Sequence, residues 1–213
     1  MLRIWGRRNS SNVQKVLWLA GELGVEFEHV AAGGQFGRLD EAEFRALNPF
    51  GLIPAIEDDG LAVWESHTIC RYLAERYGGE RWWPDVTERA RIEPWMDWHQ
   101  SAFQTPFMTG LFWGYFRTPE AERDWPSIRQ AEARCAELLG FVDSQLAGRD
   151  FLAGDRLTLA DIPLGSCMYR YFTLEIRRPD VPNVEAWYAR LSERPAFREH
   201  IMRPYEELRG RLS

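Results

Sequence analysis

The sequence changes its pattern at residues 78–84, where two adjacent glycines are followed by charged residues, two tryptophans and a proline. Before this stretch, short apolar runs typical of strands alternate with runs of helical spacing, whereas after residue 87 only helical spacing occurs. Glycine and proline interrupt regular structure, so we place a domain boundary here. The sequence predicts an α/β domain over residues 1–78, a linker over residues 79–87 and an all-α domain over residues 88–213.

The first domain is predicted to begin with a βαβ unit. Its strands are residues 2–5 and 25–31, and its helix begins near Val13 and ends at Gly24, a residue typical of helix ends. A short helix, a hairpin and a longer helix are expected next, over residues 40–47, 54–64 and 65–77. In the second domain, helices are predicted over about residues 88–115, 120–147, 158–175, 183–193 and 196–208.

The composition excludes several classes of protein. Hydrophobic residues make up 45% of the chain and aromatic residues 14%, which excludes intrinsic disorder. No run of 18 apolar residues occurs, and the first residues form no long apolar segment, so we expect neither a membrane association nor a signal peptide. The net charge of −6 argues against a nucleic-acid partner.

The cysteines and the lysine give little positive information. Cys70, Cys135 and Cys167 are odd in number and far apart, so we expect neither a disulfide framework nor a metal site. Without an export signal, a reducing cytoplasm is the expected location. Lys15 is the only lysine in the chain, and almost all positive charge comes from arginine. We interpret this as a bias of composition with no chemical meaning.

A capping box is predicted at residues 158–161. Thr158 is expected to accept a hydrogen bond from the backbone N–H of Asp161, and the Asp161 carboxylate to accept one from the N–H of Thr158. Asp161 also suits the positive end of the helix dipole. The helix that follows is mostly apolar, so the motif predicts the start of the core of the second domain. A catalytic role for Asp161 is the alternative.

Two turns of the first domain have residues suited to a ligand. Ser10, Ser11 and Asn12 precede the first helix, whose unpaired N–H groups and partial positive charge bind anions, including a thiolate. Plain N-capping is the alternative, because serine and asparagine are preferred there. At the start of a strand, a cis bond between Ile53 and Pro54 turns the preceding backbone outward, whereas a trans proline at a sheet edge is the alternative.

A third turn places Glu65 and Ser66 at a junction between a strand and a helix. A carboxylate bound there could accept hydrogen bonds from the backbone N–H and the hydroxyl of Ser66, and a neighbouring ammonium could pair with the carboxylate of Glu65. This pair matches the head group of an α-amino acid. The alternative is a pair of capping residues.

Four segments, in this order, resemble the cytosolic glutathione transferases. They are the turn at residues 10–12, Asn48-Pro49-x-Gly51-x-Ile53-Pro54, Glu65-Ser66-x-x-Ile69-x-x-Tyr72-Leu73 and Thr158-Leu159-Ala160-Asp161. The resemblance covers essentially the whole chain, and the Ser/Asn turn is similar to the theta, zeta and beta classes. It implies a thioredoxin-like N-terminal domain, a helical C-terminal domain, a cytoplasmic homodimer and a detoxifying transferase that uses glutathione as co-substrate without a metal.

The resemblance assigns the thiolate of glutathione to the first turn. Ser10 stands in the place of the catalytic serine of the theta, delta and zeta classes. Asn12 stands where beta-class members carry a cysteine and where some bacterial disulfide-reducing members carry an asparagine. The turn has no cysteine, which counts against a mixed disulfide with an enzyme thiol.

The resemblance assigns the rest of the tripeptide to the other two turns. The backbone of Ile53, before a cis Pro54, is expected to pair with the cysteinyl part of glutathione. Glu65 and Ser66 are expected to hold the γ-glutamyl end. Both assignments use the polar groups that were described above for these two turns.

One departure from the family concerns the glycine carboxylate. Several classes place a lysine directly before the position of Ile53, where this chain has Leu52. Another group must then bind that carboxylate, and Gln35, Arg38 and Arg45 are the candidates. We favour Arg38 with Gln35, because the glycine-rich stretch around them allows backbone amides to approach an anion.

A second site, for a small electrophilic co-substrate, is expected to be lined by the helix near residues 98–117 and the helix that starts at Thr158. Phe103, Phe107 and Trp113 are candidates for its apolar wall, although aromatic residues at helical spacing usually belong to a core. Arg7 is a candidate for contact with an anionic co-substrate.

Three functions remain open at this point. The first is conjugation of glutathione to small electrophiles. The second is glutathione-dependent reduction of disulfides or peroxides, which Asn12 favours. The third is a binding protein without catalysis, because a fold alone does not fix a function.

Overall fold

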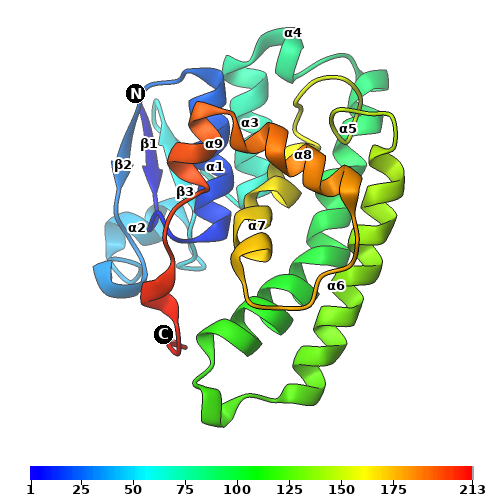
Figure 1. The fold of residues 1–213 in the computed structure, drawn as a ribbon. Helices are drawn as coiled ribbons and strands as arrows, with labels where there is room; N and C mark the ends of the chain where they lie inside the picture. Colours follow the sequence, from blue (N-terminus) through cyan, green and yellow to red (C-terminus); the bar gives the residue numbers. More distant parts are fainter. Residues whose placement is uncertain (213) are drawn as a thin grey trace. The chain divides into compact units, whose positions relative to one another are not determined.

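The computed structural model describes residues 1–212 and divides the chain into two compact units (Figure 1). The first unit comprises Met1–Arg89 and Pro195–Arg203. The second comprises Ala90–Arg194 and the residues from Pro204 onward. The chain therefore leaves the first unit, returns to it with a short segment and leaves it again.

The first unit is built on a four-stranded mixed sheet with the order β2-β1-β3-β4. Strands β1 and β2 are parallel, and the other neighbouring pairs are antiparallel. Its elements are β1 (Leu2–Trp5), α1 (Ser11–Leu23), β2 (Phe27–Val30), η1 (Gly34–Phe36), α2 (Ala42–Leu47), β3 (Ala55–Asp58), β4 (Leu61–Trp64), α3 (Ser66–Tyr77) and α4 (Gly79–Trp82). This confirms the thioredoxin-like fold and the expected order of strands and helices.

Apolar residues of the strands and helices form the core of this unit. Trp5 of β1 packs edge-on against Phe44 of α2, with ring centroids 5.9 Å apart, in a cluster that includes Ala55 of β3. Helix α1 packs against α3 and is buried along most of its length. Gly24 ends α1 with a φ of 66°, and its N–H donates to carbonyl groups of the last turn, as its position in the sequence predicts.

The segment that returns to the first unit contains α9 (Pro195–His200). Phe197 packs edge-on against Trp18 of α1, with ring centroids 4.9 Å apart. A Cβ atom on Gly21 would lie 2.9 Å from the Cβ of Ala196, so the absence of a side chain at Gly21 permits the close approach. The expected helix over residues 196–208 is interrupted, because Pro204 lacks an N–H group and disfavours helical backbone in the residue before it.

The second unit is helical, which confirms the expected all-α domain. Its elements are α5 (Val86–Trp98), which begins in the first unit, η2 (His99–Phe103), η3 (Thr105–Arg117), η4 (Glu120–Glu122), α6 (Trp125–Leu146), α7 (Asp161–Thr173), α8 (Pro182–Ser192) and η5 (Glu206–Leu208). Segments η2 and η3 have the wider turns of a π-helix. The sequence predicts one continuous helix over about residues 88–115, and the backbone is helical without a break over residues 86–117, with Pro94 inside α5 and Pro106 in the first turn of η3.

The start of α7 is organised around Asp161, which is fully buried. One carboxylate oxygen accepts from the N–H of Thr158 at 3.0 Å, as the capping box predicts. The other oxygen accepts from the N–H of Leu152 at 2.9 Å and from the indole Nε1 of Trp187 at 3.0 Å. The Thr158 hydroxyl accepts from Ala160 rather than from Asp161, which corrects that half of the predicted box. Burial raises the pKa of the Asp161 carboxyl group, and the hydrogen bonds that it accepts lower it. The effect of burial is the larger one, and the pKa is about 6. The residue therefore serves the structure of this unit.

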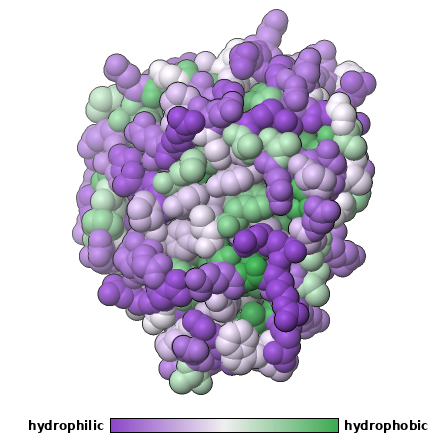
Figure 2. All heavy atoms as spheres, viewed as in Figure 1, coloured by the Kyte–Doolittle hydropathy of each residue, from purple (hydrophilic) through white to green (hydrophobic). Residues whose placement is uncertain are grey.

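On the face drawn in Figure 2, hydrophilic residues predominate and hydrophobic residues form smaller areas between them. Within residues 1–212, no helix is both long and apolar enough to cross a membrane.

Candidate functional site

The sheet of the first unit brings three predicted turns to one edge. Trp5, Ala55 and Trp64 lie side by side in the register of β1, β3 and β4. Because β3 is antiparallel to both neighbours, the end of β1, the beginning of β3 and the end of β4 meet at the same edge. The segments that contain Ser10, Pro54 and Ser66 therefore leave or enter the sheet together.

Ser10 is the N-cap residue of α1 and has an extended backbone, with φ −83° and ψ 125°. Its carbonyl accepts from the N–H of Gln14 at 2.9 Å, so the helix begins directly after it. Its hydroxyl makes no capping bond and has no other hydrogen-bond partner among residues 1–212. The alternative of plain side-chain capping is therefore wrong for Ser10, and the hydroxyl is available to a ligand.

Asn12 lies in the first turn of α1 and is half-buried. Its Oδ1 accepts from the Nζ of Lys15 at 3.0 Å. Lys15 is fully buried and also lies 3.2 Å from Nε2 of His67 on α3. The interpretation of the single lysine as a bias of composition misses this arrangement, because composition says nothing about burial.

The turn before β3 is held by Asn48, which is buried. Its Nδ2 donates to the carbonyl of Leu52 at 2.7 Å, and its Oδ1 accepts from the N–H of Phe50 at 3.0 Å. The peptide bond between Ile53 and Pro54 is cis, as predicted. Within the described part of the chain, neither the N–H nor the carbonyl of Ile53 has a hydrogen-bond partner. Leu52 is exposed and brings no charge to this turn.

Glu65 and Ser66 stand at the beginning of α3. Glu65 has φ 70° and ψ 117°, a conformation that a residue with a side chain rarely adopts. Strained backbone of this kind is concentrated at binding and active sites. Ser66 is the first residue of α3 and is only 4% exposed. Among residues 1–212, neither side chain has a hydrogen-bond partner.

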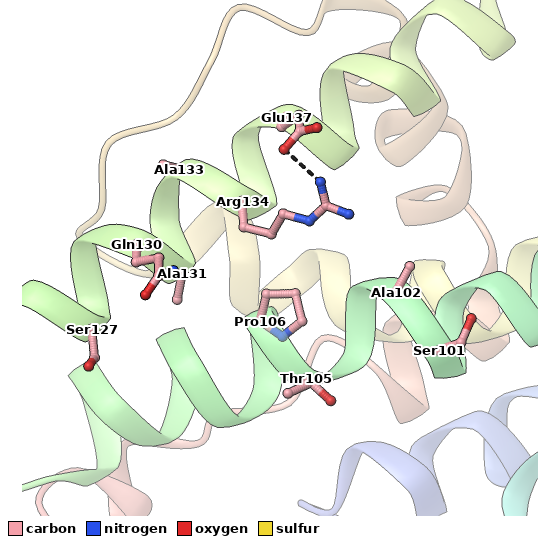
Figure 3. A pocket seen from close by; sticks show the side chains of 10 residues that line it. All are labelled: Ser101, Ala102, Thr105, Pro106, Ser127, Gln130, Ala131, Ala133, Arg134 and Glu137. Atoms are coloured by element: carbon pink, nitrogen blue, oxygen red, sulfur yellow. Dashed lines mark hydrogen bonds and ion pairs between the residues drawn. The ribbon is translucent and has the colours of Figure 1, made fainter.

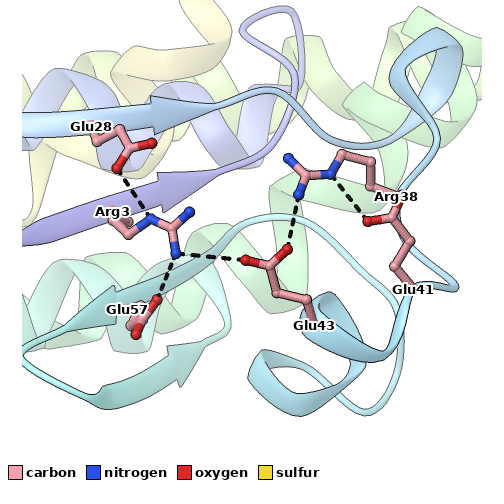
Figure 4. Close-up of polar contacts among 6 residues, drawn as sticks. All are labelled: Arg3, Glu28, Arg38, Glu41, Glu43 and Glu57. Atoms are coloured by element: carbon pink, nitrogen blue, oxygen red, sulfur yellow. Dashed lines mark hydrogen bonds and ion pairs between the residues drawn. The ribbon is translucent and has the colours of Figure 1, made fainter.

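The candidates for the glycine carboxylate lie in or after the loop that follows β2. Gln35 is exposed in η1. Arg38 has a φ of 71° and forms ion pairs with Glu41 at 3.3 Å and Glu43 at 3.0 Å, part of a network that also includes Arg3 (Figure 4). Its guanidinium carbon lies 4.6 Å from the ring centroid of the buried Trp5.

Two further residues near this loop are also held in place. The third candidate for the glycine carboxylate, Arg45, pairs with Asp40 at 2.7 Å and donates to the carbonyl of Pro49 at 2.8 Å. Arg7, predicted for the co-substrate, donates to the side chain of Asn9. The loop also borders an open hollow of about 480 Å³, lined by Gly33, Gly34, Gly37, Arg38, Leu39, Asp40 and Glu41.

The aromatic residues predicted for the co-substrate site differ in exposure. Phe103 and Phe107 are fully buried and stack with ring centroids 5.5 Å apart, so they contribute to the core of the second unit. Phe107 also packs against Tyr171 of α7. Trp113 is 38% exposed, with the guanidinium of Arg117 4.0 Å from its ring centroid. Of the three, Trp113 alone offers surface to a ligand.

A hollow of about 720 Å³ in the second unit lies between the segments η2 and η3 and helix α6 (Figure 3). Arg134 and Glu137 form an ion pair on the α6 side, at 2.6 Å. The lining of this hollow includes none of the three aromatic residues predicted for the co-substrate site. The remaining lining residues are small or polar: Ser101, Ala102, Thr105, Pro106, Ser127, Gln130, Ala131 and Ala133.

The cysteines are buried and reduced. Burial raises the pKa of Cys70 and of Cys135 to about 12, so neither is a thiolate near neutral pH. Cys167 lies 3.5 Å from Nε2 of His99. Within residues 1–212, no group of three or more histidine, cysteine or acidic residues is arranged to hold a metal ion.

Comparison with known proteins gives matches over both units. Residues 1–75 match the family model described as Glutathione S-transferase, N-terminal domain, and residues 103–195 match Glutathione S-transferase, C-terminal domain. Glutathione S-transferase GstB of Escherichia coli strain K12 is 39% identical over 207 residues, which cover 96% of this chain and 99% of that protein. Glutathione S-transferase F10 of Arabidopsis thaliana is 30% identical over 216 residues, which cover 93% of this chain and 95% of that protein.

Among solved structures, the theta-class glutathione S-transferase of Xanthomonas axonopodis pv. citri with glutathione bound is 47% identical. It superposes with a TM-score of 0.90 over 95% of this chain and 98% of that chain. Glutathione transferase F7 of Populus trichocarpa is 26% identical, with a TM-score of 0.84 over 96% of this chain and 100% of that chain. The family models, the identity to GstB over nearly its full length and the fold agree, and the chain belongs to the glutathione S-transferase family.

Proposed function

We propose that this glutathione transferase binds glutathione at the sheet edge of its first unit and activates the thiol with Ser10 and Asn12. One observation carries the proposal: four polar groups at this edge have no protein partner among residues 1–212. They are the hydroxyls of Ser10 and Ser66, the carboxylate of Glu65 and the backbone of Ile53. A thiolate, a carboxylate, an ammonium and an extended peptide backbone are the complementary groups, and glutathione contains all of them.

The free energy required for activation is within reach of these residues. A cysteine thiol has a pKa near 8.5, and the thiolate is the nucleophile. Lowering that pKa by ~2 units requires about 2.7 kcal/mol of thiolate stabilisation. One hydrogen bond to a charged group contributes roughly 1.5–3 kcal/mol. The Ser10 hydroxyl, the Asn12 amide and the N-terminus of α1 supply this stabilisation without a general base from the protein.

For the glycine carboxylate we propose Gln35 together with Arg38. Gln35 is exposed in a glycine-rich loop whose Gly33 and Gly37 N–H groups bond within the loop, whereas the N–H groups of Gly34 and Gln35 have no hydrogen-bond partner among residues 1–212. Arg38 is fixed by its ion pairs and its contact with the Trp5 ring. A fixed guanidinium binds a carboxylate with little loss of side-chain entropy.

The wider setting is also a proposal. Resemblance to the glutathione transferases supports a cytoplasmic homodimer that detoxifies small electrophilic compounds. Trp113 of the second unit is the candidate for contact with the apolar part of a co-substrate, and Arg7 of the first unit is a separate candidate for contact with an anionic group. Conjugation is the leading reaction. Glutathione-dependent reduction of disulfides or peroxides is the second candidate, favoured by the Asn12 side chain in the thiolate turn.

The test is a titration of the purified protein with glutathione across pH, followed by tryptophan fluorescence and by thiolate absorbance. The proposal predicts binding and a thiol pKa about 2 units below that of free glutathione. Absence of binding would overturn the proposed function and leave the fold and the family membership. Activity with a chloronitroaromatic compound supports conjugation, whereas activity with a glutathione mixed disulfide alone supports reduction.

Variants separate the roles of the two serines. Ser10→Ala should lower kcat by about 10- to 100-fold, because a charge-assisted bond to the thiolate is lost, and should change glutathione affinity little. Ser66→Ala should weaken glutathione binding by roughly 5- to 20-fold and leave the pKa of the bound thiol unchanged. If Asn12→Ala inactivates the enzyme and Ser10→Ala is mild, the assignment of Ser10 is wrong.

A further inference from the structure

Lys15 is a buried cation directly beneath the turn that carries Ser10 and Asn12. It has no exposed surface, although lysine is among the residues least often buried. Its Nζ donates to Oδ1 of Asn12 at 3.0 Å, one turn earlier on α1. The same Nζ lies 3.2 Å from Nε2 of His67 on α3. The single lysine of the chain therefore contacts a side chain of the turn where we propose that the thiolate binds.

The protonation state of His67 follows from this contact. A lysine ammonium has three donors and no acceptor, so Nε2 of His67 must be the unprotonated, accepting nitrogen. Burial, followed by the charges of Lys15 and Arg71, lowers the pKa of His67 to about 2. Cys70 also faces this region from α3, and burial keeps it as a neutral thiol. The ammonium therefore donates both to the neutral ring of His67 and to the amide oxygen of Asn12.

The contact also fixes the orientation of the Asn12 amide. A carboxamide has an oxygen that accepts and an NH2 group that donates. If the amide turned over, its NH2 group would face the ammonium, donor against donor, and the hydrogen bond would be lost. With Oδ1 held by Lys15, the NH2 group is on the opposite branch, and it has no hydrogen-bond partner among the described residues.

We propose that Lys15 is a positioning residue for thiol activation: it holds the Asn12 amide with its oxygen inward, so that both N–H donors are presented to the sulfur of glutathione. The inference rests on the proposed function, because it requires glutathione at this turn. Lys15 itself does not contact the sulfur. It acts through Asn12 and removes the entropic cost of ordering the amide when the thiolate forms.

The first test measures the pKa of the bound thiol in Lys15→Met, which keeps the buried apolar stem and removes the ammonium. The pKa should rise by about 0.5–1 unit, which means roughly 2- to 5-fold less thiolate at pH 6.5. Affinity for S-methylglutathione, which has no ionisable thiol, should change less than twofold. An equal loss of affinity for both ligands indicates distortion of the site and overturns the proposal.

Two variants control for indirect effects. Val16→Ala creates a cavity at the neighbouring buried position of α1 and should lower Tm without changing the thiol pKa. In the Asn12→Ala background, Lys15→Met should raise the pKa by less than half of its effect in the wild type, since the residue through which it acts is absent. A shift of more than half would show that Lys15 acts independently of Asn12, contrary to the proposal.

A spectroscopic test does not depend on the folding of Lys15→Met. Labelling with [15N]lysine gives one side-chain Nζ signal, because the chain has one lysine. Asn12→Ala should shift this signal, and glutathione should shift it more than S-methylglutathione does. A signal unaffected by Asn12→Ala would show that the hydrogen bond is absent and would overturn the inference. Binding of glutathione in the same sample shows whether the proposed function still stands.

Discussion

Ser10 and Ser127 both stand at the beginning of a helix but use their hydroxyls differently. In α6, Asp124 caps the helix by accepting from the N–H of Ser127, and the Ser127 hydroxyl donates to the same carboxylate at 2.6 Å. The Ser127 hydroxyl, followed by the Ser127 N–H, lowers the pKa of Asp124. In α1, by contrast, the Ser10 hydroxyl makes no cap bond. The first helix thus forgoes a capping interaction that would occupy the group proposed for the thiolate.

Stability measurements detect this difference. Ser10→Ala should leave Tm nearly unchanged, because it removes no hydrogen bond of the free protein. Asp124→Ala should lower Tm clearly, because it leaves the first turn of α6 uncapped. Thermal denaturation of both variants without ligand is the measurement. A large loss of Tm in Ser10→Ala would show that its hydroxyl serves the helix after all.

The titration of His67 predicts how stability depends on pH. Its pKa is about 2 in the folded protein and near 6.5 in an unfolded chain, so below pH 6.5 the unfolded state binds a proton that the folded state does not. Its contribution to the free energy of unfolding is complete above pH 6.5 and falls by about 1.4 kcal/mol per pH unit as the pH decreases.

The matched variant is His67→Gln, whose amide oxygen still accepts from Lys15. Urea denaturation between pH 4.5 and 7.5 should give a steeper loss of stability in the wild type than in this variant, by roughly 1 kcal/mol per pH unit. Parallel slopes would mean that His67 gains its proton in the folded state as readily as in the unfolded chain.

At the scale of elements, the beginning of α7 connects distant parts of the second unit. The Asp161 carboxylate joins Leu152 in the preceding loop to Trp187 on α8. All of these groups are buried, so the bonds do not compete with water. One carboxylate therefore sets the start of α7 and its position relative to α8 within this unit.

Substitution of this carboxylate should be severe. Asp161→Ala should lower the free energy of unfolding by about 3–5 kcal/mol, because buried donors lose their acceptor. Trp187→Phe removes one donor and keeps an aromatic ring, so it should cost only about 1–2 kcal/mol. Denaturation with urea gives both values. A similar cost for the two variants would contradict the central role of the carboxylate.

Most elements of the first unit were predictable, because their signals are local. Gly24 ends α1, and the turn Asp58-Asp59-Gly60 between two short apolar runs identifies the hairpin. The hydrogen-bond partners of Asp161 could not be predicted, because Leu152 and Trp187 lie 9 and 26 residues away from it along the chain. Local spacing identifies a cap but not the groups that fold against it.

The site was predicted in part for the same reason. The turns of Ser10 and Ser66 have local signatures at helix starts, which the structure shows with unpartnered hydroxyls. The burial of Lys15 was missed, because it depends on α3, about 50 residues further on. Helical spacing likewise gave no way to separate the buried Phe103 from the exposed Trp113, since exposure depends on which helices pack around them.

At the scale of the whole molecule, the first unit is discontinuous in sequence. Pro195–Arg203 is separated from Met1–Arg89 by most of the second unit, yet it completes the core around Trp18. Neither unit can therefore be isolated by a single cut of the chain.

A substitution in α9 should consequently destabilise a unit formed mainly by the other end of the chain. Phe197→Ala should lower the free energy of unfolding by about 3–5 kcal/mol, because the buried ring leaves a cavity beside Trp18. Phe141→Ala removes a ring that is 50% exposed and should cost far less. Urea denaturation followed by circular dichroism is the measurement. Equal costs would show that α9 contributes little to the first unit.

The discontinuity also matters while the protein is being made. A ribosome adds about 5–20 residues per second, so roughly 6–23 s separate the synthesis of Arg89 from that of Arg203. Throughout this interval the residues of all four strands have been made, but those of the helix that covers Trp18 have not. That surface is open to chaperones and to other nascent chains until Arg203 has been made, so the unit whose synthesis begins first is completed only after most of the second unit.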